Sequence, residues 1–364
     1  MVSRAVFAVP GDLRTVTGGY VYERSLLEAL RGLGIDVAHV PLGASFPEPS
    51  PAHVAEAATA LAAVDDDVPL ILDGFLVGAM PTTSLAAVSA PMVGIVHHPL
   101  AHEEGLDAQR RGHLFRTERD NLRLLRAVLV PSPHTARMLI SEYDVPAERI
   151  TVVRPGTVRP GTVRPEPALP RPLSASAVGP APSAPPLVLA VGIQHPRKGH
   201  DVLLRALAQL TDMPWRAVIA GTPHDPDHVA RLHELTGQLG LVHRVRLAGA
   251  VSSAERDELY RQADVFALAT RYEGYGLVFD EALVHGLPIV SCRTGAVPDT
   301  VPPDAGLLAP PDDPDAFAAA LRALLVDPAL RARLAASAAR AGARLPTWRD
   351  AARVTARVLD AVLS

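Results

Sequence analysis

Short apolar runs alternate with helical patterns in two successive series, and this alternation constrains the fold of the chain more than any other feature. The first series predicts strands at residues 4–10, 37–42, 70–75, 92–96, 128–130 and 150–153, and the second at residues 187–191, 217–220, 245–247, 265–268 and 288–291. Strands that alternate with helices form parallel sheets, because each return to the same sheet needs a crossover connection. The sequence therefore predicts an α/β protein with two doubly wound, Rossmann-like domains.

A proline-rich segment between the two series sets the domain boundaries. Residues 157–186 contain nine prolines and almost no periodic apolar pattern, which is typical of a linker. We therefore expect an N-terminal domain at residues 1–156, the linker at 157–186 and a second domain at 187–345. Residues 346–364 are expected to form a C-terminal helix that packs back on the N-terminal domain.

Charge, cysteine content and hydropathy exclude several classes of protein. The formal net charge is -4, which argues against a nucleic-acid-binding protein. Cys292 is the only cysteine, so an intrachain disulfide and a cysteine-based metal site are excluded. No segment approaches the roughly 18 consecutive apolar residues that a transmembrane helix needs. We expect a cytoplasmic protein with no transmembrane segment.

Positive charge is concentrated in one stretch of the N-terminal half. Six arginines between residues 110 and 126 lie along a predicted helix, interleaved with Glu118 and Asp120. We interpret this stretch as a solvated face. The alternative is contact with an anionic surface or acceptor, which leaves a peripheral membrane contact open.

The segment with the most chemical information follows the strand predicted at residues 265–268. That strand runs into Glu273-Gly274-Tyr275-Gly276 and then into a helix predicted from Leu277 to His285. A helix N-terminus after a glycine loop favours an anion such as a diphosphate. Glu273 is expected at the mouth of the helix and Glu281 on its body, where each carboxylate can accept hydroxyl hydrogen bonds. Ordinary surface charge is the alternative for two isolated glutamates.

The segment from Glu273 to Leu283 resembles the E-x7-E motif of retaining family 4 glycosyltransferases, which have the GT-B fold. The resemblance extends to Gly18-Gly19, to Pro131-Ser132 and to residues 153–156, 192–199, 286–290 and 295–301. It implies two Rossmann-like domains facing each other across a cleft that holds a nucleotide-sugar donor. It also implies sugar transfer with retention of anomeric configuration, without a metal or any other cofactor.

The resemblance assigns roles to individual residues. Glu273 corresponds to the glutamate that contacts donor sugar hydroxyls, Glu281 to the one that contacts the ribose, and Arg197-Lys198 to the basic pair that holds the diphosphate. The expected donor-binding set also contains Gly18, Gly19, Gly192, Val251, Gly274, Tyr275, Gly276 and Leu277. We expect Gly18-Gly19 to form a loop that lets the backbone approach the diphosphate or the acceptor.

Composition supports the basic pair independently. The chain contains 35 Lys and Arg residues, of which Lys198 is the only lysine. A fixed cation next to the leaving phosphate lowers the barrier to breaking the glycosidic bond without a metal. Many family members have an arginine where this chain has Ile193, and we expect Arg197 to substitute for it. A weaker hydrogen bond from Gln194 or His195 is the alternative.

A pair of histidines follows a strand of the first domain. His97 and His98 come directly after residues 92–96, at the carboxyl edge where open α/β sheets bind ligands. The family often has a histidine there near the donor sugar, and we expect His97 rather than His98 to fill this catalytic role. A zinc site is the less favoured alternative, because spaced Asp, Glu or Cys partners are missing. The D-x-D pattern of residues 65–67 precedes a strand and is interpreted as solvated.

The identity of the donor and acceptor is only partly constrained. Residues 249–253, which follow a second-domain strand, contain no carboxylate to recognise guanine, so UDP-sugars are favoured over GDP-sugars. The acceptor stays open between a small molecule, a glycan and a lipid-linked compound. A GT-B nucleotide-sugar epimerase or phosphorylase is the alternative enzyme. A two-domain sugar-binding protein is the non-enzymatic alternative.

Overall fold

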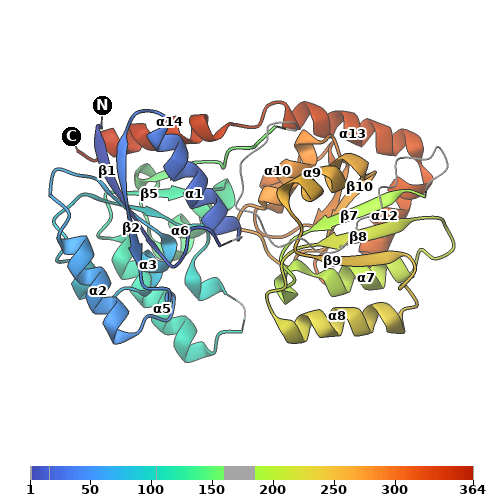
Figure 1. Cartoon of the computed structure of the whole chain (residues 1–364), viewed down its shortest axis with the longest axis horizontal. Coiled ribbons are helices and arrows are strands. Elements are labelled where there is room, and N and C mark those ends of the chain that lie inside the picture. Colours follow the sequence, from blue (N-terminus) through green and yellow to red (C-terminus); the bar gives the residue numbers. More distant parts are fainter. Residues whose placement is uncertain (1, 16, 104, 160–184, 364) are drawn as a thin grey trace. The chain divides into compact units, whose positions relative to one another are not determined.

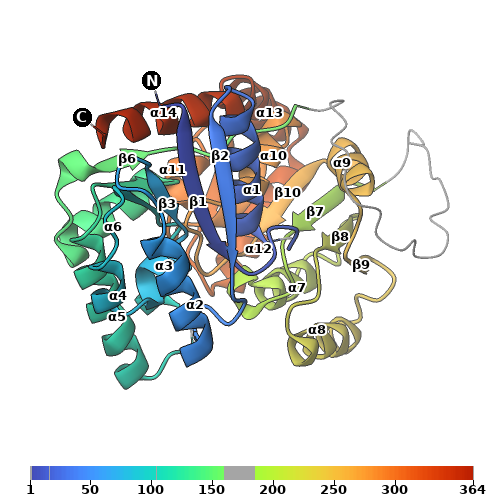
Figure 2. The same cartoon turned by 60° about the vertical axis from the view of Figure 1, so that its left-hand side comes forward.

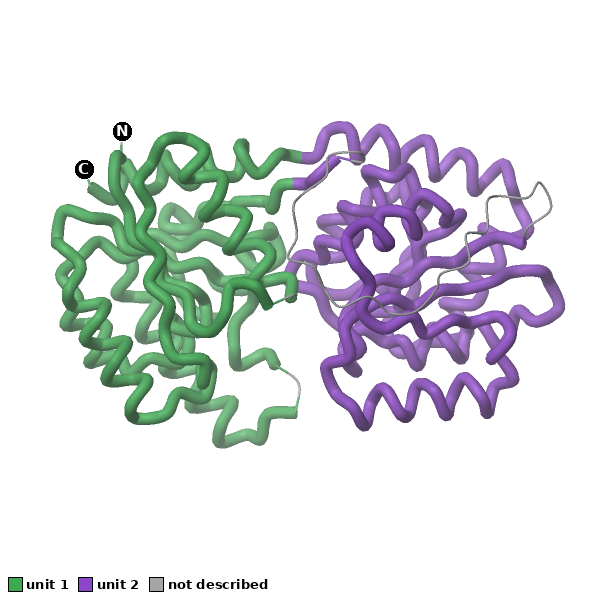
Figure 3. Tube along the Cα trace, in the orientation of Figure 1, with its two compact units in different colours: residues 1–156, 346–364 green, residues 157–345 purple. Residues whose placement is uncertain are grey.

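The computed structural model describes residues 2–15, 17–103, 105–159 and 185–363, which form two compact units (Figures 1 and 3). Unit 1 comprises Met1–Gly156 and Pro346–Ser364, and unit 2 comprises Thr157–Leu345. Most of the predicted linker, residues 160–184, lies outside the described residues.

Unit 1 is built on a six-stranded sheet in the order β2-β1-β3-β4-β5-β6. Its strands are β1 (Arg4–Pro10), β2 (Asp36–Leu42), β3 (Leu70–Leu72), β4 (Met92–Ile95), β5 (Ala127–Val130) and β6 (Ile150–Val152). All the neighbouring strands pair in parallel. The strand order reverses between β1 and β3, and open α/β sheets bind ligands at the carboxyl ends of the strands at such a switch point.

Helices cover both faces of this sheet. Helices α1 (Gly18–Arg31) and α14 (Trp348–Ala361) share one hydrophobic cluster with the sheet. The opposite face carries α2 (Pro51–Ala62), α3 (Gly74–Ala79), α4 (Thr82–Leu85), α5 (Ala108–Leu122) and α6 (Pro133–Tyr143). Along β1, Phe7 joins the first cluster and Ala8 the second, because successive strand residues point to opposite faces.

The C-terminal helix α14 packs against α1 within unit 1 (Figure 2). It buries Ala352 and Leu359 beside Leu26 and Leu30 of α1. A capping box formed by Thr347 and Asp350 satisfies backbone donors at the start of α14.

Unit 2 is built on a second six-stranded parallel sheet in the order β12-β11-β10-β7-β8-β9. Its strands are β7 (Leu187–Val191), β8 (Arg216–Ala220), β9 (Val245–Gly249), β10 (Val265–Leu268), β11 (Ile289–Cys292) and β12 (Gly306–Ala309). The order reverses between β7 and β10, which is the order of a dinucleotide-binding Rossmann sheet. Strand β12 is absent from the sequence prediction because its four residues begin with a glycine and give too short an apolar run.

Helices also cover both faces of the second sheet. One face carries α7 (His200–Ala208), α8 (Pro226–Gln238) and α12 (Pro314–Val326). The other carries α9 (Ser253–Gln262) and α10 (Leu277–Val284), with α13 (Pro328–Gly342) packed against α10 and the short α11 (Val297–Thr300) nearby in the chain. Helices α12 and α13 are separate, because the side chain of Asp327 caps α13 and Pro328 begins it.

Most of the arginine-rich stretch lies on α5. The expectation that Glu118 belongs to a solvated face of this helix is wrong. Arg111 and Arg116 are exposed, but Glu118 is fully buried and accepts a hydrogen bond from the backbone N–H of Leu100 at 3.1 Å. Burial raises the pKa of this carboxyl to about 8. Glu118 therefore satisfies a buried backbone donor and does not contribute to a solvated face. Among the helices of the described segments, none has the length and apolar character required to cross a bilayer.

Candidate active site

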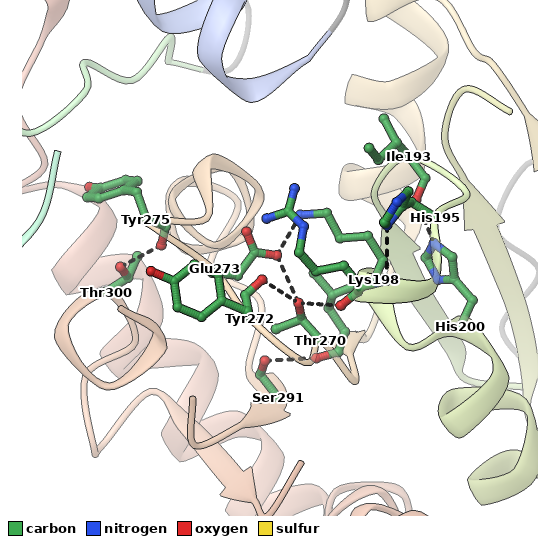
Figure 4. A network of polar contacts seen from close by, with 12 residues as sticks. Ile193, His195, Lys198, His200, Thr270, Tyr272, Glu273, Tyr275, Ser291 and Thr300 are labelled. Atoms are coloured by element: carbon green, nitrogen blue, oxygen red, sulfur yellow. Dashed lines mark hydrogen bonds and ion pairs between the residues drawn. The ribbon is translucent and has the colours of Figure 1, made fainter. Parts of the chain in front are cut away.

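Two loops meet at the switch point of unit 2. Residues 192–199 follow β7 and residues 269–276 follow β10, and these two strands are neighbours in the sheet. Between the loops, Lys198 Nζ lies 2.6 Å from Glu273 Oε1, and Thr270 Oγ1 donates to the same oxygen at 3.1 Å (Figure 4). The carboxyl edge of the sheet therefore presents a buried ion pair at the place where such sheets bind ligands.

Glycines make room for the lysine and its loop. A Cβ on Gly192 would lie 3.4 Å from Cγ and Cδ of Lys198, so the aliphatic part of the lysine lies against this glycine. Gly199 has φ +60, and a Cβ there would lie 1.9 Å from the carbonyl oxygen of Ala269. Only glycine fits at position 199, because the loop passes directly against the backbone that follows β10.

Burial and charge act in opposite directions on the ion pair. Glu273 is 4% exposed. Burial opposes its ionisation, but the charges of Lys198 and then Arg197 hold the pKa of Glu273 below its usual value. Burial lowers the pKa of Lys198, and the carboxylate of Glu273 partly offsets this effect. The Lys198–Glu273 pair has no net charge, so Arg197 makes the group of three net positive.

The contacts to Glu273 leave part of its carboxylate available. The bonds from Lys198 and Thr270 both end on Oε1. The backbone carbonyl of Glu273 accepts a hydrogen bond from the N–H of Ala296 at 2.8 Å. Because Oε1 and the backbone are held, Oε2 is the atom of Glu273 that can accept a hydrogen bond from a ligand hydroxyl.

Thr270 and Arg271 were not predicted from the sequence, although both support the site. Arg271 forms ion pairs with Asp201 at 2.9 Å and with Asp312 at 2.7 Å. Its backbone N–H donates to the carbonyl of Arg197 at 2.8 Å. Arg271 therefore joins the loop after β10 to the short helix Pro196–Lys198. The available signal was their position, two and three residues before the motif glutamate.

The N-terminus of α10 lies between the two motif glutamates. Gly276 caps the helix with φ +89, and Leu277 is its first residue. Tyr275 is buried and donates from its hydroxyl to Asp280 at 2.6 Å, so its phenol supports the loop. The first backbone N–H groups of a helix have no intrahelical acceptor, which makes this end suitable for a diphosphate.

Glu281 and Val251 lie on other elements of unit 2. Glu281 is on α10, with its side chain 32% exposed and Oε1 3.8 Å from a guanidinium nitrogen of Arg256. Val251 follows β9 and packs against the hydrophobic cluster under α9 and α10. In the same connection, Ser252 and Glu255 form the capping box of α9.

The predicted residues of unit 1 gather around His97. Gly18 and Gly19 are the first two residues of α1, so the expectation of a loop there is wrong. A Cβ on Gly19 would lie 3.5 Å from Cδ2 of His97, which shows how closely the ring approaches the helix. His97 Nε2 lies 3.6 Å from Glu23, whereas His98 pairs with Glu103.

The structure thus divides the predicted catalytic residues between the two units. Arg197, Lys198 and Glu273 come together in unit 2, and His97 lies in unit 1. Within the described segments, no group of three or more His, Cys, Asp or Glu side chains is arranged to hold a metal ion. Independence from metal stays a prediction.

Family models match both units of the chain. The model described as "Glycosyl transferases group 1" matches residues 175–341, and "Glycosyltransferase Family 4" matches residues 74–158. The chain belongs to glycosyltransferase family 4. This membership confirms the family inferred from the E-x7-E motif.

Curated relatives of this family 4 chain carry glycosyltransferase names. A D-inositol 3-phosphate glycosyltransferase of Xylanimonas cellulosilytica is 35% identical over 229 residues, which cover 62% of this chain and 54% of that protein. An MMP alpha-(1->4)-mannosyltransferase of Mycolicibacterium hassiacum is 26% identical over 88% of this chain and 77% of that protein. The chain spans about half the length of the first of these relatives.

Solved structures show that the fold is GT-B. Sucrose-phosphate synthase of Thermosynechococcus elongatus superposes with a TM-score of 0.77 at 20% identity, covering 98% of this chain and 99% of that one. Anabaena HepE in complex with UDP gives a TM-score of 0.71 at 18% identity, covering 98% of this chain and 100% of that one. The predicted α/β class and GT-B fold are confirmed.

Proposed function

We propose that this family 4 chain transfers a sugar from a nucleoside-diphosphate sugar to an acceptor hydroxyl with retention of anomeric configuration. The observation that carries the proposal is the buried Lys198–Glu273 ion pair, 2.6 Å across, at the switch point of unit 2. The pair combines a cation for a diphosphate with a carboxylate for sugar hydroxyls, next to a helix N-terminus.

The proposed reaction breaks the bond between the anomeric carbon and the phosphate oxygen. Negative charge then develops on the leaving diphosphate, where Lys198, Arg197 and the N-terminus of α10 stabilise it. The acceptor oxygen forms its bond to the same face of the anomeric carbon, and its proton passes to the leaving phosphate oxygen. Glu273 holds the sugar by accepting a hydroxyl hydrogen bond on Oε2. These fixed charges take the place of a metal ion.

We propose a UDP-sugar as the donor. The connection between β9 and α9 holds no carboxylate at residues 249–253, and the carboxylate of Glu255 is used by Ser252 in the helix cap. Guanine would bring two N–H donors that find no carboxylate there. HepE, a structural relative, has been solved with UDP and with UDP-glucose. Glu281 on α10 is assigned to the ribose hydroxyls.

Calorimetric titration in EDTA tests the donor site. We expect the chain to bind UDP with micromolar affinity and GDP at least about tenfold more weakly, because unpaired guanine donors cost free energy. Glu281→Gln is expected to weaken UDP binding by about tenfold, through loss of charge-assisted hydrogen bonds to the ribose.

Glu258→Gln is the matched control, since this exposed α9 glutamate pairs with Arg261 outside the motif. Its affinity for UDP should equal that of the unsubstituted chain. Tighter binding of GDP than of UDP would contradict the proposal that the donor is a UDP-sugar. A folded chain that binds neither nucleotide would contradict the site itself.

Product analysis tests the stereochemistry. With an α-linked UDP-sugar and an accepted hydroxyl compound, the coupling constant of the anomeric proton in the product should report an α-linkage. A β-linked product would overturn the mechanism in which the acceptor oxygen bonds to the same face of the anomeric carbon that the phosphate leaves. Consumption of the donor without any acceptor would favour the epimerase alternative.

A further inference from the structure

The switch point of unit 1 carries a polar cluster of its own. Glu23 lies on α1, Asp73 follows β3 as the N-cap of α3, and His97 follows β4. Strands β1, β3 and β4 are consecutive neighbours in the sheet, so their carboxyl ends bring these side chains to one edge. Glu23 is 1% exposed and Asp73 is 4% exposed, and neither has a role in the proposed reaction.

Glu23 is a buried carboxyl group whose hydrogen-bonding partner is the neighbouring carboxyl group of Asp73. Among the described residues, no other donor is in hydrogen-bonding geometry to its two oxygens, and the buried Nε2 of His97 lies 3.6 Å away without a partner of its own. Leaving such groups unpaired costs free energy. A side-chain movement of about 0.6 Å would close this gap to an ordinary N–H···O hydrogen bond.

Asp73 has a second partner, outside the carboxyl pair. Its Oδ1 accepts a hydrogen bond from the backbone N–H of Phe75 at 2.7 Å, which caps α3. Burial raises the pKa of Glu23 to about 7, and burial together with the charge of Glu23 raises the pKa of Asp73 well above its usual value. Two adjacent buried carboxyl groups do not both ionise, so the pair carries at most one negative charge.

One edge of the His97 ring packs against the protein, and another part of the side chain is exposed. Its Cδ2 and Nε2 face Gly19, and Tyr22 packs against it edge-on with ring centroids 5.0 Å apart. Nε2 is buried, yet 24% of the side chain is exposed, so the exposed part lies away from Nε2. Burial lowers the pKa of His97, which favours a neutral ring with a single N–H. The partner of one ring nitrogen then decides which nitrogen carries the proton.

We propose that Glu23 is a positioning residue for His97. Oε1 of Glu23 accepts a hydrogen bond from the Nε2–H of His97 and so makes Nδ1 the acceptor for a hydroxyl group of a sugar substrate. The proton that the carboxyl pair shares links Asp73 to Glu23 and leaves this oxygen available. The identity of the hydroxyl rests on the proposed function, but the choice of tautomer does not.

Nuclear magnetic resonance of the full chain, labelled with 15N-histidine and free of ligand, tests the tautomer directly. The His97 signals are assigned by their loss in His97→Gln. In the unsubstituted chain at neutral pH, we expect the proton on Nε2. Glu23→Gln presents an amide N–H that can donate to Nε2, so the Nδ1–H tautomer should become populated. Glu23→Asp keeps a carboxylate and should retain the Nε2–H form.

Glu28→Gln is the matched control, because Glu28 is an exposed glutamate on the same helix. It should leave the His97 signals unchanged. An Nδ1–H tautomer in the unsubstituted chain, or an unchanged tautomer in folded Glu23→Gln, would overturn the proposal. If Glu23→Gln does not fold, the tautomers of the unsubstituted chain and of Glu23→Asp still test the proposal.

Rates of sugar transfer provide the second readout. We expect Glu23→Gln to lower kcat by about tenfold to a hundredfold, the usual effect of removing an orienting partner, with Glu28→Gln unchanged. An unchanged kcat in Glu23→Gln would overturn the positioning role. Absence of transfer in the unsubstituted chain, with the Nε2–H tautomer present, would contradict the proposed function and leave the tautomer assignment standing.

Discussion

Replacing Lys198 by methionine is expected to lower kcat/KM for sugar transfer by about 10²–10³-fold, the usual effect of removing one fixed donor from a developing anion. Methionine retains the unbranched stem that lies against Gly192 but has no charge. The loss should appear mainly in kcat, because charge on the leaving phosphate is greatest in the transition state. Initial rates measured over a range of donor concentrations separate kcat from KM.

The same substitution should also destabilise the chain, because it leaves the buried carboxylate of Glu273 without its closest cation. We expect a loss of about 3 kcal/mol in the free energy of unfolding, which is at the lower end of the range for breaking a buried ion pair. The loss is at this end because Arg197 still stabilises the carboxylate. The double variant Lys198→Met/Glu273→Gln removes both charges. It should recover most of the stability while remaining inactive.

Arg205→Met is the control for loss of a positive charge, because Arg205 is exposed on the neighbouring helix α7. It should retain both activity and stability. Activity within about threefold of the unsubstituted chain in Lys198→Met would contradict the role of Lys198. A double variant as unstable as Lys198→Met would contradict the ion-pair explanation of its stability.

Replacing Gly199 by alanine is expected to cost about 3 kcal/mol or more of unfolding free energy, from left-handed backbone strain and a steric clash combined. The new Cβ would lie 1.9 Å from the carbonyl oxygen of Ala269, and a backbone atom cannot turn aside as a flexible side chain can. This clash can be relieved only if the loop after β7 moves, and that movement would displace Lys198 from Glu273. Chemical denaturation gives the stability, and transfer assays should show a parallel loss of activity.

Gly240→Ala separates the two contributions. Gly240 has φ +69, close to the value at Gly199. Apart from Gly240 and its two neighbours in the chain, however, no atom of the described residues lies within 4 Å of a Cβ built there. Its substitution should cost only about 1 kcal/mol, from backbone strain alone. Equal losses in the two variants would show that the loop after β7 does not press against the backbone after β10.

The alternating pattern of the sequence predicted most of the architecture. The first strand was predicted at residues 4–10, as the structure has it, and α10 begins between Glu273 and Glu281 as expected. The strand expected at residues 70–75 ends at Leu72, because Asp73 caps a helix. Local signals of this kind decide where an element begins and ends.

The order of strands within a sheet lies outside what a local pattern contains. Lys198 and Glu273 are 75 positions apart in the sequence. They meet only because β7 pairs with β10, although β8, β9 and their helices lie between these two strands along the chain. Glu23, Asp73 and His97 likewise meet because β1, β3 and β4 are neighbours. The sequence by itself determined the α/β class, the family motif and the candidate side chains. Tertiary structure alone decided which of them touch and which are buried, because desolvation and charge pairing depend on strands brought together from distant parts of the chain.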